Sequence, residues 1–282
     1  MANPQVRFTW NIHWSCNFRC SYCFFDGHWA EYGRRNVYQT VEQWMGHWRR
    51  IYEKYGRCYL TINGGEPFAY PNFVELMVQV SALHWPINVT TNTSLHLKEF
   101  VERVDPAKVS ISISFHPQYH KIDEFLKTVK FLRDHKANIG CINFVAWPPF
   151  LNDLSDYIRR FQEIGESLKV IPFIGAYEGV NYPDHYNEEQ KKILGLSDNW
   201  LESKRHKGML CRAGNQSALL LPTGKVARCG QIGDRYLIGD FFQEGFSLMK
   251  EPMPCDEQFC PCDEWKVIPD EKPPEKAGAW LP

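Results

Sequence analysis

Several features that would place this 282-residue chain in a membrane or on nucleic acid are lacking. No stretch approaches the ~18 consecutive apolar residues of a membrane span, and residues 1–7 have no apolar core that could serve as a signal peptide. An excess of charge of one sign is also lacking, because 32 Lys and Arg are balanced by 33 Asp and Glu. Without a basic field, neither nucleic acid nor an anionic membrane is an expected partner. We therefore expect a cytoplasmic protein.

The remaining composition is that of an ordinary globular domain, with 44% hydrophobic and 23% charged residues. The length suits one large α/β domain, alone or with a small appendage. Ten cysteines in a reducing compartment are predicted to be metal ligands or core residues rather than disulfides. Eight of them form two clusters, whereas Cys58 and Cys141 lie in strand-like runs and are predicted to be inert core residues.

The first cluster, Cys16, Cys20 and Cys23, lies on one short loop after the strand-like run 6–13. Thiolates are soft ligands that suit iron–sulfur clusters, zinc or cuprous copper. A fourth cysteine is lacking, and three cysteines on a cubane would leave one iron free to bind another molecule. The alternative is a structural zinc site with His13 or His28 as the fourth ligand.

Strand-like and helical patterns alternate along the next 160 or so residues, a spacing typical of parallel βα units. The clearest helix begins at the capping box Thr40-Val-Glu-Gln43 and ends at Gly56. Six strands of this kind form either an open sheet or a barrel, and functional groups then gather at the carboxyl ends of the strands. The expected strands are 6–13, 58–63, 87–92, 108–116, 138–145 and 169–174, the further helices are 71–83, 97–104, 122–132, 154–164 and 187–194, and 24–39 is expected to be a loop.

The CxxxCxxC spacing, with Tyr22 before the third cysteine, and the stretch Gly64, Gly65, Glu66 and Pro67 together resemble the radical S-adenosylmethionine (SAM) enzymes. The resemblance implies an α/β fold, a partial (β/α)6 TIM barrel that is open on one side for the substrate. It also implies a [4Fe–4S] cluster whose open iron binds the amino and carboxylate groups of SAM. Cleavage of SAM to a 5′-deoxyadenosyl radical, hydrogen abstraction from a substrate, and an electron donor such as flavodoxin or ferredoxin would follow.

The same resemblance assigns SAM-binding roles to residues at the strand ends. Residues 64–67 resemble the SAM-binding segment, where glycines let the backbone approach a ligand closely. Tyr22 would contact the adenine, and Asn92 and Ser114 are candidates for the SAM carboxylate and ribose. Three residues are possible substrate contacts on this rim, although the first could equally cap its strand: His116, Tyr177 and Glu178.

The second cluster comprises Cys211, Cys229, Cys255, Cys260 and Cys262. The first two bracket a predicted hairpin at 217–229, and so small a unit needs a metal or docking onto the barrel for stability. The arrangement resembles the twitch or SPASM modules that follow the barrel in many radical SAM enzymes.

A full SPASM module needs seven cysteines for two clusters, so five imply one auxiliary [4Fe–4S] cluster. Cys211 and Cys229 would be ligands, with Cys260 or Cys262 as the spare cysteine, and structural zinc is the alternative. The expected organisation is a barrel at 1–182, a connector at 183–208, the module at 209–268 and a tail at 269–282.

No residue pattern identifies the substrate. Peptide modification is the commonest activity among enzymes of this layout, but the chain starts at its first predicted strand without a preceding peptide-recognition domain. A small molecule such as a sugar is therefore expected as readily as a peptide. The competing class is a non-catalytic iron–sulfur or zinc-binding protein with a structural or electron-transfer role.

Overall fold

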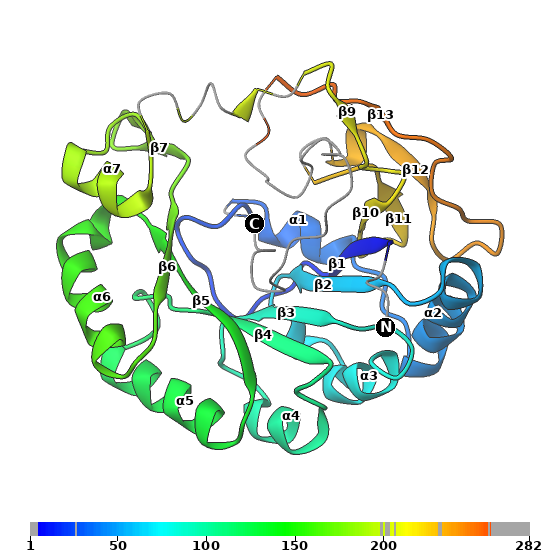
Figure 1. The fold of residues 1–282 in the computed structure, drawn as a ribbon, viewed down its shortest axis with the longest axis horizontal. Helices are drawn as coiled ribbons and strands as arrows, with labels where there is room; N and C mark the ends of the chain where they lie inside the picture. The colour runs from blue at the N-terminus through cyan, green and yellow to red at the C-terminus, as the bar shows by residue number, and fades with distance from the viewer. Residues whose placement is uncertain are drawn as a thin grey trace.

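The computed structural model describes residues 5–25, 27–197, 200, 204–205, 207–230, 233–258 and 260. Six parallel strands follow one another in a sheet, and helices cover its convex outer side (Figure 1). The predicted series of βα units is therefore confirmed. The strands are β1 (Arg7–His13), β2 (Tyr59–Gly64), β3 (Ile87–Thr91), β4 (Val109–Ser114), β5 (Asn138–Ala146) and β6 (Leu168–Pro172).

The helices that connect these strands begin close to the predicted positions. The capping box of α2 is present, because the Thr40 side chain accepts a hydrogen bond from Gln43 N and the Gln43 side chain accepts one from Thr40 N. The connecting helices are α2 (Val41–Tyr55), α3 (Phe73–Val80), α4 (Leu97–Arg103), α5 (Ile122–Asp134) and α6 (Leu154–Glu163), with short 3₁₀ helices η1 (Pro67–Ala69) and η2 (Pro148–Asp153) before two of them.

The prediction of a loop over 24–39 is wrong for α1 (Trp29–Arg34). This helix has six residues and none of them is buried, so it has no apolar period that the sequence could reveal. A helix at 187–194 is confirmed as α7 (Glu188–Leu194), and it is preceded by a two-stranded hairpin of β7 (Gly175–Tyr177) and β8 (Val180–Tyr182).

The outer face of the sheet is apolar and packs on the helices. Trp10 on β1 lies 4.5 Å from Trp44 and 5.1 Å from Trp48, measured between ring centroids. The aromatic stripe of α2 therefore packs on the sheet, as its helical spacing predicts. Since side chains alternate along a strand, the residues between these apolar positions face the concave side.

The concave face carries polar side chains that bind one another. Asn88 donates to Ser110 Oγ and accepts from Ser112 Oγ, both at 2.9 Å. Arg7 donates to Thr61 Oγ1 at 2.9 Å on the neighbouring strands. The interior of a closed TIM barrel is packed with branched apolar residues, whereas this face carries polar side chains that are hydrogen-bonded to one another.

The C-terminal strands extend the same sheet beyond β1. The predicted hairpin is confirmed as β10 (Ser217–Leu220) and β11 (Lys225–Ala227), and β12 (Leu237–Asp240) pairs with β11. β10 runs parallel to β1, with Arg7 opposite Ser217, so the hairpin is docked onto the barrel by backbone pairing. A separate ribbon of β9 (Leu210–Cys211) and β13 (Met253–Pro254) lies nearby (Figure 1).

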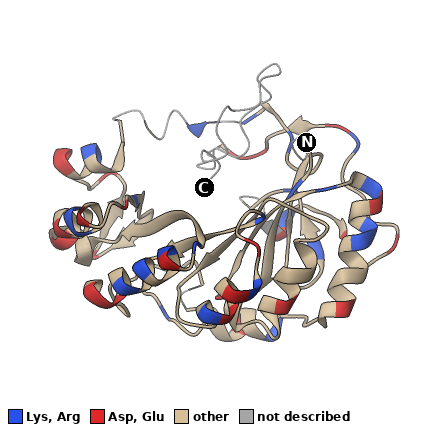
Figure 2. Ribbon diagram, turned by 60° about the horizontal axis from the view of Figure 1, so that its bottom comes forward, with Lys and Arg blue, Asp and Glu red and all other residues tan. Residues whose placement is uncertain are grey.

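Charged residues lie mainly on the helices, where both signs are interspersed (Figure 2). Within the described residues, no helix combines the length and the apolar character needed to cross a membrane.

Candidate cofactor-binding site

The loop with Cys16, Cys20 and Cys23 leaves the carboxyl end of β1. Cys20 is buried and the other two thiols are half-buried. Phe18 N donates to Cys16 Sγ at 3.3 Å, and Cys23 N donates to Cys20 O at 3.0 Å. Repulsion from neighbouring cysteine thiolates adds to the rise in the pKa of Cys16 and Cys20.

Cys16 and Cys20 favour the neutral thiol form when no cation is present. Burial raises the pKa of Cys16, and it raises the pKa of Cys20 to about 12. Thiolates rather than thiols bind metals, so a bound cation would supply the charge compensation that this loop lacks. Within the described residues, no three His, Cys, Asp or Glu side chains are already arranged to hold a metal ion. The donor set itself, three sulfurs on one loop, fits a cluster of iron and sulfide.

Gly64 and Gly65 bring the end of β2 against the start of the cysteine loop. Gly65 N donates to His13 O at 2.8 Å, and Glu66 N donates to Ser15 O at 2.9 Å. A Cβ atom on Gly65 would lie 1.9 Å from Ser15 O, and one on Gly64 would lie 2.2 Å from His13 O. The glycines are expected from the sequence to let the backbone approach a ligand closely. The structure shows instead that they approach the backbone of His13 and Ser15.

The Glu66 carboxylate joins β2 to β3. It accepts hydrogen bonds from Phe68 N at 3.1 Å, Thr91 Oγ1 at 2.7 Å and Asn92 N at 2.6 Å. The residue is 1% exposed, and burial raises its pKa to about 7 against the opposing effect of these donors. Pro67 begins the 3₁₀ helix η1 immediately afterwards. Within the described chain, residues 64–67 therefore act as a framework for the cysteine loop.

Asn92 lies beside the cysteine loop, as its place at the end of β3 predicts. Its Nδ2 atom is 3.8 Å from Cys16 Sγ and donates to Asn17 Oδ1 at 3.0 Å. Ser114 ends β4 in register with Asn143 on β5. Both residues therefore lie at the carboxyl rim. Of the two, only Asn92 has described contacts that reach the cysteine loop.

Tyr22 and His116 come together at this rim. The Tyr22 hydroxyl lies 2.7 Å from His116 Nδ1, and the two rings stack with centroids 5.9 Å apart. Burial lowers the pKa of His116 to about 3, so its imidazole is neutral at physiological pH. His116 N also donates to His120 Nδ1 at 3.1 Å.

Tyr177 joins the same aromatic group from β7. Its ring lies 5.4 Å from Trp147, whose ring is 5.6 Å from Tyr22. Glu178 sits in the following turn and hydrogen-bonds with Tyr177. Trp147 is a rim residue that the sequence analysis missed, and only its position after β5 could have pointed to it.

Four of the five C-terminal cysteines are also brought together. Cys211, Cys229 and Cys260 are buried in one cluster, and half-buried Cys255 packs against it. Cys262 lies outside the described residues. Arg228, which no sequence pattern singles out, is 1% exposed and lies beside these thiols.

Arg228 connects the segments that carry the C-terminal cysteines. Its Nε donates to Ala213 O at 3.1 Å, and one terminal nitrogen donates to Met253 O at 2.6 Å. The other terminal nitrogen lies 3.4 Å from Asp256 Oδ2. Burial raises the pKa of Cys211, and the Arg228 charge opposes that rise.

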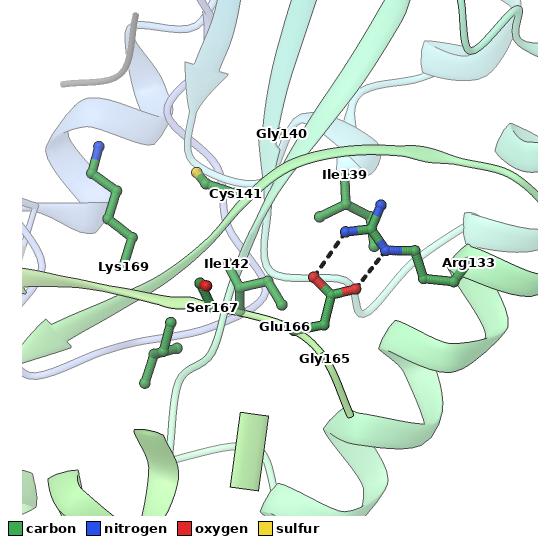
Figure 3. Close-up of a pocket in the computed structure, with 10 residues that line it drawn as sticks. Arg133, Ile139, Gly140, Cys141, Ile142, Gly165, Glu166, Ser167 and Lys169 are labelled. Carbon is green, nitrogen blue, oxygen red and sulfur yellow. Dashed lines mark hydrogen bonds and ion pairs between the residues drawn. The ribbon is translucent and has the colours of Figure 1, made fainter. Parts of the chain in front are cut away.

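A pocket of about 290 Å³ lies elsewhere, at the amino ends of β5 and β6 (Figure 3). Arg133 and Glu166 form a bidentate ion pair on one side of the pocket, while Cys141 and Lys169 lie on the other side. Half-buried Cys141 donates to Asn143 Oδ1 at 3.2 Å, whereas Cys58 is fully buried, as expected of a core cysteine. This pocket is at the end of the strands opposite the cysteine loop and belongs to neither cysteine cluster.

The fold and the cysteine loop define the class of protein. A family model described as the radical SAM superfamily matches residues 11–148, which include both the cysteine loop and residues 64–67. The match identifies residues 11–148 as a radical SAM domain. Enzymes of that superfamily use a [4Fe–4S] cluster and SAM.

Individual relatives are more distant. The antilisterial bacteriocin subtilosin biosynthesis protein AlbA of Bacillus subtilis (strain 168) is 22% identical over 275 residues, which cover 87% of this chain and 59% of that protein. A probable GTP 3′,8-cyclase of Methanocaldococcus jannaschii is 29% identical over 175 residues, which cover 58% of this chain and 57% of that protein. The chain thus spans less than two thirds of both relatives.

Among solved structures, anSMEcpe with bound AdoMet superposes with a TM-score of 0.60 at 16% identity. The match covers 84% of this chain and 74% of that one. At this identity the likeness establishes the fold, which is the partial TIM barrel that the sequence resemblance predicts.

Proposed function

We propose that this chain cleaves SAM with a [4Fe–4S] cluster held by Cys16, Cys20 and Cys23 and uses the resulting radical on a substrate in the barrel mouth. When bound, the cluster supplies the electron that cleaves SAM to a 5′-deoxyadenosyl radical, which abstracts hydrogen. The observation that carries the proposal is the cysteine loop itself, fixed by backbone hydrogen bonds to Gly65 and Glu66 at the carboxyl rim of the barrel.

The chain's own residues would bind and orient SAM at this rim. Asn92, next to Cys16, and Ser114 are proposed to contact the SAM carboxylate and ribose, and Tyr22 the adenine. Residues 64–67, including Gly64 and Gly65, would hold the cysteine loop in the position that SAM binding requires. The protein's contribution is orientation and the exclusion of water that would quench a radical.

We further propose that residues 209–268 form an auxiliary-cluster module with one [4Fe–4S] cluster. Its ligands would be Cys211, Cys229 and two of Cys255, Cys260 and Cys262. Among the described residues, Cys211, Cys229 and Cys260 form one buried cluster and Cys255 packs against it. A four-cysteine zinc site is the competing assignment.

The substrate is proposed to be a polar molecule, either a peptide or a small molecule. The support is the polar character of the concave face, where Asn88, Ser110 and Ser112 hydrogen-bond with one another. The relatives' names include both bacteriocin biosynthesis and a GTP cyclase, so they favour neither class. The electron would come from a donor such as flavodoxin or ferredoxin.

The test is anaerobic reconstitution with iron and sulfide, followed by SAM and dithionite. Wild-type chain should form 5′-deoxyadenosine, and the Cys16→Ala, Cys20→Ala, Cys23→Ala triple variant should form none above background. Equal amounts from both proteins would overturn the proposal. Metal analysis of the triple variant addresses the second cluster, since about four retained irons support a cubane and zinc supports the structural alternative.

A further inference from the structure

Residues 116–120, between β4 and α5, contact the residues that lie between one cysteine of the loop and the next, here called spacers. Arg19 N, in the first spacer, donates to Tyr119 Oη at 2.7 Å. Ser21 N, in the second spacer, donates to Gln118 Oε1 at 3.0 Å. Gln118 Nε2 returns a hydrogen bond to Ser21 Oγ at 2.8 Å. Each spacer is therefore joined to segment 116–120 through a backbone N–H group.

The first spacer makes further side-chain contacts. The Phe18 ring stacks on Tyr119 with centroids 4.1 Å apart and an interplanar angle of 11°. Asn17, the preceding residue, accepts from Asn92 Nδ2 at 3.0 Å and donates to Ser94 Oγ at 2.8 Å. The spacers are thus held by side chains from the carboxyl ends of two strands, β3 and β4.

Side chains take the place of regular backbone pairing in this loop. A loop outside any helix or sheet has no hydrogen-bond ladder, so its N–H groups need other partners. The directions of the three thiols depend on the backbone of the spacers between them. Fixing that backbone before a ligand binds lowers the conformational entropy that binding has to remove. The contacts are therefore those expected of a loop that is preorganised for its ligand.

The two residues that contact the spacer N–H groups lie at the surface of the rim. Gln118 is exposed, and Tyr119 is 43% exposed. If these side chains were shortened, water could reach the N–H groups of the spacers, so no buried donor would be left unpaired. Their loss should therefore loosen the cysteine loop and change the free energy of unfolding little.

We propose that Gln118 and Tyr119 are positioning residues that hold the backbone between Cys16 and Cys23 in its cluster-binding conformation before a cluster binds. This inference rests on the proposed function, because it assumes that the loop binds a cluster. Both residues act through the spacers rather than by contact with SAM or substrate. The loss of either side chain should free one spacer and weaken the binding of the cluster.

The hold on the spacers is tested on the metal-free chain by amide hydrogen exchange, resolved by residue with NMR. Tyr119→Phe keeps the stacked ring but removes the hydroxyl that accepts from Arg19 N, so exchange at Arg19 should accelerate roughly fivefold. Gln118→Leu should have the same effect at Ser21. Gln118→Glu keeps an oxygen that can accept from Ser21 N and should preserve the slow wild-type exchange there. Unaltered exchange at Arg19 and Ser21 in the first two variants would overturn the inference.

Asp105→Ala is the matched control for these variants. The exposed Asp105 side chain accepts a hydrogen bond from Ala107 N at 2.9 Å, which is a bond of the same kind before the amino end of β4. Its removal should accelerate exchange at Ala107 and leave Arg19 and Ser21 unchanged. Faster exchange at all three amides would indicate a general loosening of the chain and contradict a specific hold on the loop.

The effect on cluster binding is tested by the rate of iron loss to a chelator after anaerobic reconstitution. Cys255→Ala and Cys260→Ala are included in every protein to remove the proposed auxiliary cluster. The Gln118→Leu, Tyr119→Phe double variant should lose iron about tenfold faster than its parent, whereas Asp105→Ala should match the parent. The thermal unfolding midpoints of the metal-free double variant and of Asp105→Ala should agree within a degree or two.

The possible results separate this inference from the proposed function. Equal rates of iron loss with and without the two side chains would refute the positioning role and leave the proposed function intact. Faster iron loss together with a much lower unfolding midpoint would assign the effect to the whole fold and also refute the role. If the wild-type chain assembles no cluster, the proposed function fails and the role in cluster binding fails with it. The exchange rates then still decide whether Gln118 and Tyr119 hold the loop.

Discussion

The substitution Gly65→Ala tests how the end of β2 holds the cysteine loop. The new Cβ would lie 1.9 Å from Ser15 O, 2.4 Å from Ser15 C and 2.8 Å from Trp14 C. All three are backbone atoms, so no side chain can rotate away. To reach ordinary van der Waals contact the two strand ends would have to separate by about 1.5 Å.

That separation would break the two hydrogen bonds that join the strand ends. Gly65 N to His13 O and Glu66 N to Ser15 O, now 2.8 and 2.9 Å, would exceed hydrogen-bonding distance. Two lost backbone bonds and the overpacking together should cost about 3 kcal/mol of unfolding free energy. For a chain of this size the midpoint of thermal unfolding should fall by roughly 6–12 °C.

The assay is thermal unfolding followed by circular dichroism on metal-free protein, so that the result does not depend on a cofactor. Gly46→Ala is the matched control, because Gly46 lies inside α2 and nothing is within 4 Å of an added Cβ. This control should gain up to about 1 kcal/mol from helix propensity. A Gly65→Ala midpoint within a degree or two of wild type would refute the close-approach argument.

Two further predictions concern buried charge. Because the pKa of Glu66 is about 7 in the folded chain, above its value of 4.5 when unfolded, wild-type stability should fall by about 3 kcal/mol as pH rises through this interval. Urea unfolding at both ends of this pH interval should show the loss of unfolding free energy in the wild-type chain and not in Glu66→Gln. An equal loss in both proteins would contradict the prediction. Arg228→Leu leaves the carbonyls of Ala213 and Met253 without their buried donor. It should cost about 3 kcal/mol and speed proteolysis near residue 253, and an unchanged cleavage rate would contradict the bridging role.

The βα series could be predicted because each element carries its own local signal. α2 has a capping box and a helical apolar stripe, and the strands are short apolar runs. α1 could not be predicted, since its six residues bury no side chain. The docking of β10 on β1 could not be predicted either, because the pairing of Arg7 with Ser217 joins segments that are far apart in the chain and leaves no local pattern.

The site shows the same division between local and long-range information. The type and spacing of Cys16, Cys20 and Cys23 indicated a soft-metal loop, and the glycines at 64–65 indicated a close approach. The sequence could not reveal that this approach is to the backbone of His13 and Ser15. It also could not reveal that segment 116–120 holds the loop, since those hydrogen bonds join residues nearly 100 positions apart.

The central claim is that three cysteines on the loop after β1 leave one iron of a cluster free to bind SAM. The most direct test is pulsed EPR of the dithionite-reduced cluster with SAM labelled with ¹⁵N at its amino group, using protein in which Cys255→Ala and Cys260→Ala remove the proposed auxiliary cluster. The account predicts a ¹⁵N hyperfine coupling strong enough to require a direct iron–nitrogen bond. An EPR signal that SAM does not alter, with no ¹⁵N coupling, would contradict it.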